Sequence, residues 1–313
     1  MILKKHSFVV YLLLGAVLSE GSCQHKELCY TSTARVLVVF DWTKAPGASV
    51  TDGMSLWLFP EKDGRPLHYE FCDRKGGVID VPRGRYRAFC MNNNSEVLLY
   101  RNLEHWHTFE VYTRQSSQLE PLGMQRNVPE ANPEGDPAVL APDILWSDTA
   151  TDVTLRSASH QERLTLYPQD QLCTYTAEVR NVKNLEYVSA VSASLSGLSG
   201  SFFPCTGELS AIRSLIPFSC APETASLIKG RLLTFGPSSH SNKTLRLALY
   251  MLLTDGSKYY QTFDVTAQVN NAPDKRHVHI VVDGLEVPKP IVNGGGFQPA
   301  VDEWDIIHEN ISM

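Results

Sequence analysis

Cys23 is the residue of this sequence with the most definite chemistry. It follows a basic start at Lys4 and Lys5, an apolar run and a short stretch of mostly small residues, which together predict a secretory signal over residues 1–22. A cysteine at the cleavage point is typical of bacterial lipoproteins, in which the acylated cysteine becomes the mature N-terminus. Glu20 departs from that pattern, because this position is usually apolar. The alternative is an ordinary signal peptide, with Cys23 removed or paired.

Acylation of Cys23 would make a membrane the first partner of this chain. Two or three acyl chains give an effectively permanent anchor, whereas one is marginal. The longest later apolar stretch, Leu247–Leu253, has only the length of a strand and is too short to span a bilayer. We therefore expect residues 23–34 to form a lipidated tether and the rest of the chain to lie in water on one side of the membrane.

The other six cysteines could form disulfides in an oxidising compartment. The pairs closest in sequence that could lie across neighbouring strands are Cys72 with Cys90 and Cys205 with Cys220. Buried free thiols are the alternative. No C-x-x-C motif is present, so the cysteines do not indicate a metal site.

No motif in the sequence predicts catalysis. The chain has no G-x-S-x-G, S-x-x-K, H-E-x-x-H or Walker pattern. His277 and His279, like His105 and His107, would share one face of a strand, but no third metal ligand follows at a telling spacing, which favours solvent-facing histidines. We expect a protein that is not an enzyme and holds no metal or cofactor, although a pair of carboxylates brought together by the fold would escape this reasoning.

Aromatic residues offer a second kind of chemistry, the stacking of sugars. The tryptophans that could form such a platform are Trp57, Trp106, Trp146 and Trp304. The alternative is that they fill a core, as aromatic residues in strands usually do. A glycan partner stays open, whereas the net charge of −6 argues against nucleic acid.

The elements that must position these residues are strands. Their β-branched and aromatic content and the turn signals between them predict a first sandwich over residues 35–126, with strands at 35–42, 54–59, 67–72, 77–81, 85–91, 96–100 and 109–113. A stretch with four prolines begins near residue 127 and predicts a linker over residues 127–150.

The strand pattern resumes after this stretch and predicts a second sandwich over residues 151–292. Its clearest element is a hairpin over residues 245–265 with Asp255-Gly256 at the turn, a pair typical of a type I′ turn. Three glycines then precede the last residues, so we expect 293–313 to be a hinged tail or strand. The other strands are expected at 152–156, 163–167, 172–182, 187–195, 212–218, 227–235 and 277–282.

Several blocks of the sequence resemble a family of Bacteroidales lipoproteins of undefined function, which is similar to the fimbrillin and minor-fimbrium anchor proteins. The resemblance covers nearly the whole mature chain. The blocks are RVLVVFDW (35–42), MSLWLFPEKDGRPLHYEF (54–71), VPRGRYRAFCMNN (81–93), YTRQ (112–115), LEPLG (119–123), LCTYTAEVRNVKNLEYVSAVSASLSGLSG (172–200), DGSKYYQTFDVTAQV (255–269), APDKRHVHIVVDGLEVPKP (272–290) and NGGGFQPAVDEW (293–304).

This resemblance implies two transthyretin-like, Greek-key β-sandwich domains in series, held by lipid on the outer membrane and facing the cell exterior. It also implies assembly with fimbrial subunits by strand addition, in which backbone hydrogen bonds give affinity and side-chain pockets give register. The candidate donor strand would contain Trp304, Ile306, Ile307 and Ile311. The alternative is that this segment completes a sheet of its own chain.

Two short motifs gain meaning from the same resemblance. Asp148-Thr149-Ala150 matches the short acceptor for O-glycosylation in these bacteria, with Thr149 as the acceptor. Residues 24–27 are similar to the signal that sends such lipoproteins to the cell surface. The sequence therefore predicts a structural or adhesive surface lipoprotein, an anchor or accessory subunit of a fimbria-like assembly, with a glycan-binding lipoprotein for nutrient capture as the alternative.

Overall fold

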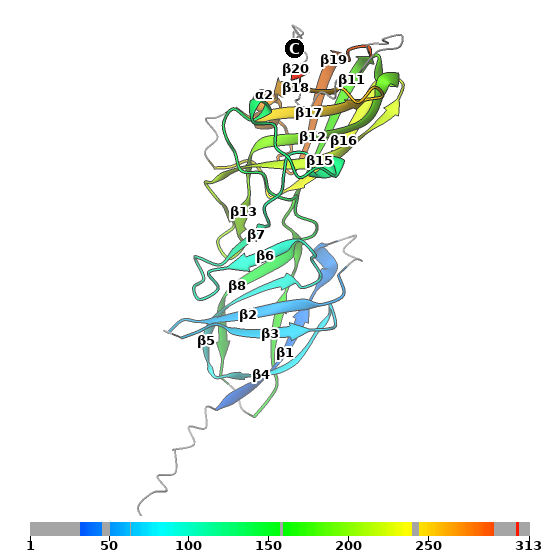
Figure 1. Cartoon of the computed structure of the whole chain (residues 1–313). Helices are drawn as coiled ribbons and strands as arrows, with labels where there is room; N and C mark the ends of the chain where they lie inside the picture. Colours follow the sequence, from blue (N-terminus) through cyan, green and yellow to red (C-terminus); the bar gives the residue numbers. More distant parts are fainter. Residues whose placement is uncertain are drawn as a thin grey trace, which may run out of the picture.

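The protein is an elongated all-β molecule. A computed structural model describes residues 32–45, 51–62, 64–156, 159–239, 244–290 and 305–306. In Figure 1 most of the first half of the chain lies in the lower part of the molecule and most of the second half in the upper part. The all-β expectation is confirmed, because the described chain is built almost entirely from strands and has a single, five-residue α-helix, α2 (Thr266–Asn270).

Ten strands form the lower part of the molecule and the layer above it. They are β1 (Thr33–Phe40), β2 (Met54–Pro60), β3 (Leu67–Phe71), β4 (Gly76–Pro82), β5 (Gly84–Asn92), β6 (Leu98–Arg101), β7 (Glu110–Thr113), β8 (Trp146–Leu155), β9 (Glu162–Leu166) and β10 (Gln169–Asp170). The first seven lie within two residues of the strands that the sequence predicts.

A five-stranded sheet, ordered β10-β8-β5-β2-β3, is the middle layer of the lower part. One face packs against the three-stranded sheet β4-β1-β9. Along β2, Met54, Leu56 and Leu58 face that core, whereas Trp57 and Phe59 belong to a second core on the opposite face. A strand buried on both faces reads as a continuous apolar run, which explains the sequence MSLWLFP.

The upper part has one eight-stranded sheet that is folded over on itself. Its order is β19-β11-β16-β15-β12-β17-β18-β20, and the strands are β11 (Cys173–Lys183), β12 (Val188–Ser199), β15 (Arg213–Thr224), β16 (Leu227–Thr234), β17 (Arg246–Leu253), β18 (Lys258–Asp264), β19 (His277–Glu286) and β20 (Asp305–Ile306).

The fold in this sheet occurs within β15. Residues 213–219 of β15 pair with β12, and residues 220–224 pair with β16, so the strand changes partner at Ser219-Cys220. The two halves of the sheet thus face each other across a core to which β11, β12, β17 and β19 contribute alternate side chains. This arrangement is a sandwich made from one continuous sheet.

A small central sheet joins the two parts. Its order is β14-β13-β7-β6, with β13 (Ser201–Phe203) and β14 (Glu208–Leu209) coming from the second half of the chain. β13 pairs with β7 of the first half through Ser201–Tyr112 and Phe202–Val111. In Figure 1 the labels β6, β7 and β13 lie between the lower and upper parts. The sequence gives no sign of β13 and β14, which are only three and two residues long.

The segment expected to be a linker over residues 127–150 is instead a packed part of the molecule. Between β7 and β8 the chain crosses the outer face of β12, β17 and β18, where Leu119, Val128 and Ala131 form a core with Tyr250 and Tyr260. Its prolines shape short 3-10 turns. It has no periodic apolar pattern because a few spaced side chains suffice to cover a sheet face.

The boundary expected at residue 151 also differs from the structure. β8, β9 and β10 lie in the sheets of the lower part, so the chain returns there from the upper part before it enters β11. β9 runs parallel to β1, with Val36 opposite Glu162. Sequence order alone could not reveal this return, because β8 and β9 have the same alternating pattern as the strands that follow them.

The hairpin of β17 and β18 is confirmed, but its turn is different. Of the pair Asp255-Gly256, only Gly256 has a positive φ, at 85°. A type I′ turn requires a positive φ at both central residues. Leu253 and Ser257 close the loop with a backbone hydrogen bond of 2.9 Å, so the turn is a wider loop with glycine at its left-handed position.

Candidate functional site

The C-terminal strand β20 lies beside β18 at the edge of the eight-stranded sheet. The two strands are parallel, with Asp305 opposite Tyr259 and Ile306 opposite Tyr260. In this structure Ile306 therefore completes a sheet of its own chain, the alternative considered for this segment. The other candidate donor residues lie outside the described residues: Trp304, Ile307 and Ile311.

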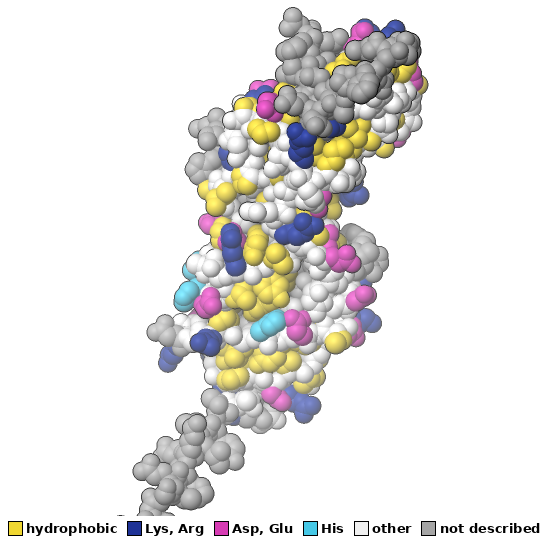
Figure 2. Space-filling view, in the orientation of Figure 1, with side chains coloured by type: hydrophobic (Ala, Val, Ile, Leu, Met, Phe, Trp, Pro, Cys, Tyr) yellow, Lys and Arg dark blue, Asp and Glu magenta, His cyan; other side chains and the backbone are white. Residues whose placement is uncertain are grey.

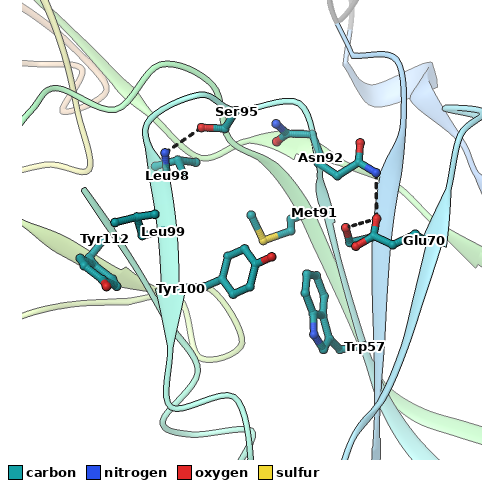
Figure 3. Close-up of a pocket in the computed structure, with 11 residues that line it drawn as sticks. Trp57, Glu70, Met91, Asn92, Ser95, Leu98, Leu99, Tyr100 and Tyr112 are labelled. Carbon is teal, nitrogen blue, oxygen red and sulfur yellow. Dashed lines mark hydrogen bonds between the residues drawn. The ribbon is translucent and has the colours of Figure 1, made fainter. Parts of the chain in front are cut away.

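A pocket of about 550 Å³ lies beside the free side of β6. In Figure 3, Tyr100 of β6 and Trp57 of β2 approach each other across it, and Glu70 of β3 lies on the far wall. The Tyr100 and Trp57 rings meet edge to face with their centroids 5.9 Å apart. Asn92 and Ser95 close one end (Figure 3). The pocket thus combines aromatic rings, amides, hydroxyls and one carboxylate.

Two hydrogen bonds and a contact with a histidine hold the Glu70 carboxylate in place. Its Oε2 accepts from the Ser55 hydroxyl at 2.7 Å and from Nδ2 of Asn93 at 2.8 Å, and its Oε1 lies 2.8 Å from Nε2 of His68. The His68 ring in turn stacks on Trp57, with centroids 4.4 Å apart. This carboxylate can accept a hydrogen bond from a cation or a hydroxyl that enters the pocket.

Neither Glu70 nor Tyr100 is among the site residues that the sequence indicates. The signal was present in the strand pattern, because Ser55 is a polar residue in the otherwise apolar β2 and Glu70 lies opposite it in β3. Such a polar pair on a face that is otherwise buried indicates a place where the covering layer ends. Recognising it requires the pairing register, which the sequence alone does not show.

The tryptophans do not form an exposed platform in the described part of the chain. Trp57 and Trp106 are 2% and 8% exposed and belong to the core beneath the central sheet. Trp146 is half-buried and packs edge to face against Trp42, at 6.0 Å. Trp304 lies outside the described residues. The core alternative thus holds for Trp57 and Trp106, and Tyr100 is the exposed aromatic residue of the pocket, at 45%.

His277 and His279 have ordinary polar partners. His277 Nδ1 lies 2.8 Å from Asp274 Oδ2, and His279 Nδ1 lies 2.9 Å from the Thr176 hydroxyl. Across the residues that the structure describes, no group of three or more His, Cys, Asp or Glu side chains could hold a metal ion. The residues present therefore give no basis for assigning a metal to either pair.

Of the two alternatives for the cysteines, the structure has free thiols at Cys72, Cys90, Cys205 and Cys220. Cys72 follows the end of β3 and Cys90 lies in β5, on opposite sides of β2. Two strand spacings amount to about 10 Å, which is longer than the Cα separation of about 7 Å that a disulfide can span.

The second pair is separated by a whole layer. Cys205 packs in the core beneath the central sheet, and Cys220 packs against the core of the upper part. Burial raises the pKa of the Cys220 thiol to about 12, and burial also raises the pKa of Cys205. Both are therefore protonated near neutral pH and poor nucleophiles.

The central sheet contains a carboxylate that links the two halves of the chain. Glu110 of β7 accepts hydrogen bonds from Arg101 Nε and Nη2 at 2.7 and 2.8 Å. Burial alone would raise the pKa of Glu110, but its hydrogen bonds with Arg101 and with Ser201 of β13 outweigh burial and lower it. Glu110 is therefore ionised at neutral pH.

Thr149 lies within β8, where it is opposite Phe89 of β5 and half-buried. Its role as an acceptor for O-glycosylation stays a prediction. Cys23 lies outside the described residues. None of the helices in the described ranges is long and apolar enough to cross a membrane.

The fold and its layers place the chain in a class of all-β sandwich proteins with known structures. A crystal structure of a "putative adhesin" from Bacteroides ovatus matches with a TM-score of 0.61 and 22% identity, covering 83% of this chain and 94% of that one. The fimbrial anchor protein Mfa2 from Porphyromonas gingivalis matches with a TM-score of 0.50 and 13% identity, covering 80% and 90% of the two chains.

Within this class, the chain belongs to the family described as domain of unknown function DUF5119, whose model matches residues 22–219. It is also similar along nearly its whole length to a curated Bacteroides ovatus protein, "Putative fimbrium anchoring subunit Fim4B". The identity is 24%, and the alignment covers 96% of each chain. The resemblance that the sequence blocks indicate is thereby confirmed.

Proposed function

We propose that this protein is a surface lipoprotein that serves as an anchor or accessory subunit of a fimbria-like assembly. The observation that carries the proposal is the similarity to the fimbrium anchoring subunit over 96% of both chains. A relative that matched only one sandwich could share a fold module with a different role. A match along the whole length supports a shared architecture, with the sandwich layers held in the same order.

The anchor in this proposal is lipid on Cys23. A tether of residues 23–34 would then lead directly to β1, which begins at Thr33 at the lower end of the molecule. The upper part, with the edge formed by β18 and β20, would lie far from the membrane, where it could meet other subunits. This geometry suits a protein that joins a membrane to an assembly.

Strand addition at the β18 edge is the second element of the proposal. Within the described residues, β20 pairs with β18 at Tyr259 and Tyr260, and an incoming strand would have to displace it there. Residues 304–311 would then be free to act as a donor strand to a neighbouring subunit. Backbone hydrogen bonds would supply affinity both at the β18 edge and at the edge of the neighbouring subunit, and side-chain pockets would set the register.

The lipid anchor can be tested with Cys23→Ala and Cys29→Ala variants expressed in the native type of cell. Metabolic labelling with an alkyne fatty acid should mark the wild type and Cys29→Ala, which keeps the acceptor cysteine, but not Cys23→Ala. Cell fractionation should find the first two in the membrane fraction. Labelling of Cys23→Ala at the wild-type level would contradict the proposed anchor.

A further inference from the structure

The layer that covers the five-stranded sheet ends before the sheet does. β6 is the edge strand of the central sheet. The five-stranded sheet beneath it continues through β2 to β3. The pocket that contains Ser55, Trp57 and Glu70 is the uncovered step between them. Figure 2 shows hydrophobic side chains gathered on this face of the lower part, over the region where Figure 1 places β6.

β6 presents unpaired backbone groups toward this step. In an antiparallel pair, successive residues point their N–H and C=O groups alternately toward the partner strand and away from it. The Leu98 N–H donates to the Ser95 hydroxyl, at 2.9 Å, and not to β7. Leu98, and Tyr100 two residues further on, are therefore the residues whose backbone N–H and C=O groups point away from β7. The Leu98 N–H is already bonded to Ser95, so the groups open to an added strand are the Leu98 carbonyl and the Tyr100 N–H and carbonyl.

The side chains beside this edge are unusually apolar for a surface. Leu99 and Tyr100 are 44% and 45% exposed, and they are two of the four large hydrophobic residues that are most exposed in the described chain. Among the pocket residues, Glu70 is the only one with an acidic or basic side chain. A basic side chain would thus find a carboxylate together with the exposed ring of Tyr100, which favours a cation electrostatically.

From these observations we infer that β6 and the pocket receive an extended segment of a partner protein. The segment pairs with β6 as a fifth strand of the central sheet, and a Lys or Arg side chain of the segment reaches Glu70. This deepens the proposed function, on which it rests for the kind of partner, by assigning a second strand-addition edge that is distinct from β18.

A sugar suits this pocket less well than a peptide. Sugar stacking needs an open aromatic face, and Trp57 is 2% exposed, which leaves Tyr100 alone. Backbone pairing, in contrast, needs the free edge that β6 offers. An oligosaccharide that binds here is therefore an outcome that would overturn the inference.

The test selects binders for the purified mature chain from a phage library of random ten-residue peptides. Selection should be repeated with Tyr100→Pro. The Tyr100 N–H points away from β7, so a proline there removes this N–H donor and the tyrosine ring but keeps every hydrogen bond to β7. Glu70→Gln keeps the size of the side chain, removes its charge and replaces one acceptor oxygen with an amide donor. Glu186→Gln is the matched control, since Glu186 is an exposed carboxylate in the upper part.

The expected peptides share alternating β-forming residues with Lys or Arg at a fixed position. As synthetic peptides, they should bind Glu70→Gln and Tyr100→Pro at least about tenfold more weakly than the wild type, and for Glu70→Gln this is the effect of losing one charge-assisted hydrogen bond. They should bind the control Glu186→Gln as tightly as the wild type. Circular dichroism and thermal melting confirm that each variant is folded; if Tyr100→Pro is not, Glu70→Gln alone decides.

Three outcomes would overturn the inference: no peptide selected, peptides that bind Glu70→Gln as tightly as the wild type, or an oligosaccharide from a glycan array that competes at Tyr100. This test uses purified protein, whereas the anchor proposal is tested in cells. A loss of peptide binding with an intact lipid anchor would therefore count against the β6 edge alone.

Discussion

At the scale of single residues, the most consequential interaction is a buried ion pair. Asp136, in the segment that was expected to be a linker, accepts from Arg213 Nε at 3.0 Å and from the Gly197 N–H at 2.9 Å. The two side chains are 5% and 8% exposed. Arg213 also donates to the Thr244 carbonyl at 2.9 Å, so its charge is well satisfied.

The prediction at this scale is that Asp136→Ala destabilises the protein by about 3–5 kcal/mol, because it leaves the Arg213 charge buried without its partner. Urea unfolding measures this change. Asp152→Ala is the control, since the Asp152 side chain is 73% exposed, and it should change the free energy of unfolding by less than about 1 kcal/mol. Equal effects of the two variants would show that the buried pair has no special role.

The sequence could not have indicated this pair. Asp136 and Arg213 are 77 positions apart, and Asp136 lies among prolines and acidic residues that read as a solvated connection. Cys23 is the opposite case, because its chemistry is defined by adjacent residues. Residue-scale predictions from one sequence succeed when the partners are neighbours in the chain, and fail when the fold must bring them together.

At the scale of elements, strands were predictable because their alternation is local. The first seven predicted strands match β1–β7, and the hairpin of β17 and β18 was found from its alternation and its Asp-Gly pair. Among the strands that escaped are β13 and β14, which are too short for alternation to be visible. Yet these two strands are the ones that join the halves of the chain.

The central sheet should make unfolding of the two halves cooperative. Phe202 of β13 is 7% exposed and stacks on Phe235 at 6.2 Å, in the core shared with Trp57. We predict that Phe202→Ala costs about 3–5 kcal/mol and lowers the unfolding midpoint of both halves together. Ile212→Ala, at a nearby residue that is 65% exposed, should leave both midpoints unchanged.

Two probes separate the halves in this experiment. Four of the five tryptophans lie in the lower part, namely Trp42, Trp57, Trp106 and Trp146. In a Trp304→Phe background, tryptophan fluorescence therefore follows the unfolding of that part. Hydrogen exchange of the amides in β12 and β17 follows the upper part. If Phe202→Ala shifted only one of the two midpoints, the central sheet would not couple the halves.

At the scale of the whole molecule, the layers explain why the chain crosses between its parts. Both the five-stranded sheet and the β12–β17–β18 face are apolar on two sides and need a cover on each. The central sheet covers the first, and the segment before β8 covers the second. A sequence shows that a strand is apolar on both faces, but it does not show which distant segment covers each face. The sandwich class could therefore be predicted, whereas the order of the layers could not.

The proposed role also belongs to this scale, since it depends on where the whole molecule lies in an assembly. Lipid on Cys23 would fix the lower end at the membrane, and the edges of β6 and β18 would be available to other subunits. A protein with this geometry should occupy one end of a filament, close to the cell, and should not recur along its length.

Immunogold electron microscopy of cells that carry an epitope-tagged copy of the full chain tests this claim most directly. The account predicts gold particles at the membrane-proximal ends of surface filaments, and a loss of cell-attached filaments when Cys23→Ala replaces the wild type. Particles spread evenly along filaments, or a cell surface on which the tagged protein is abundant and never associated with a filament, would contradict it.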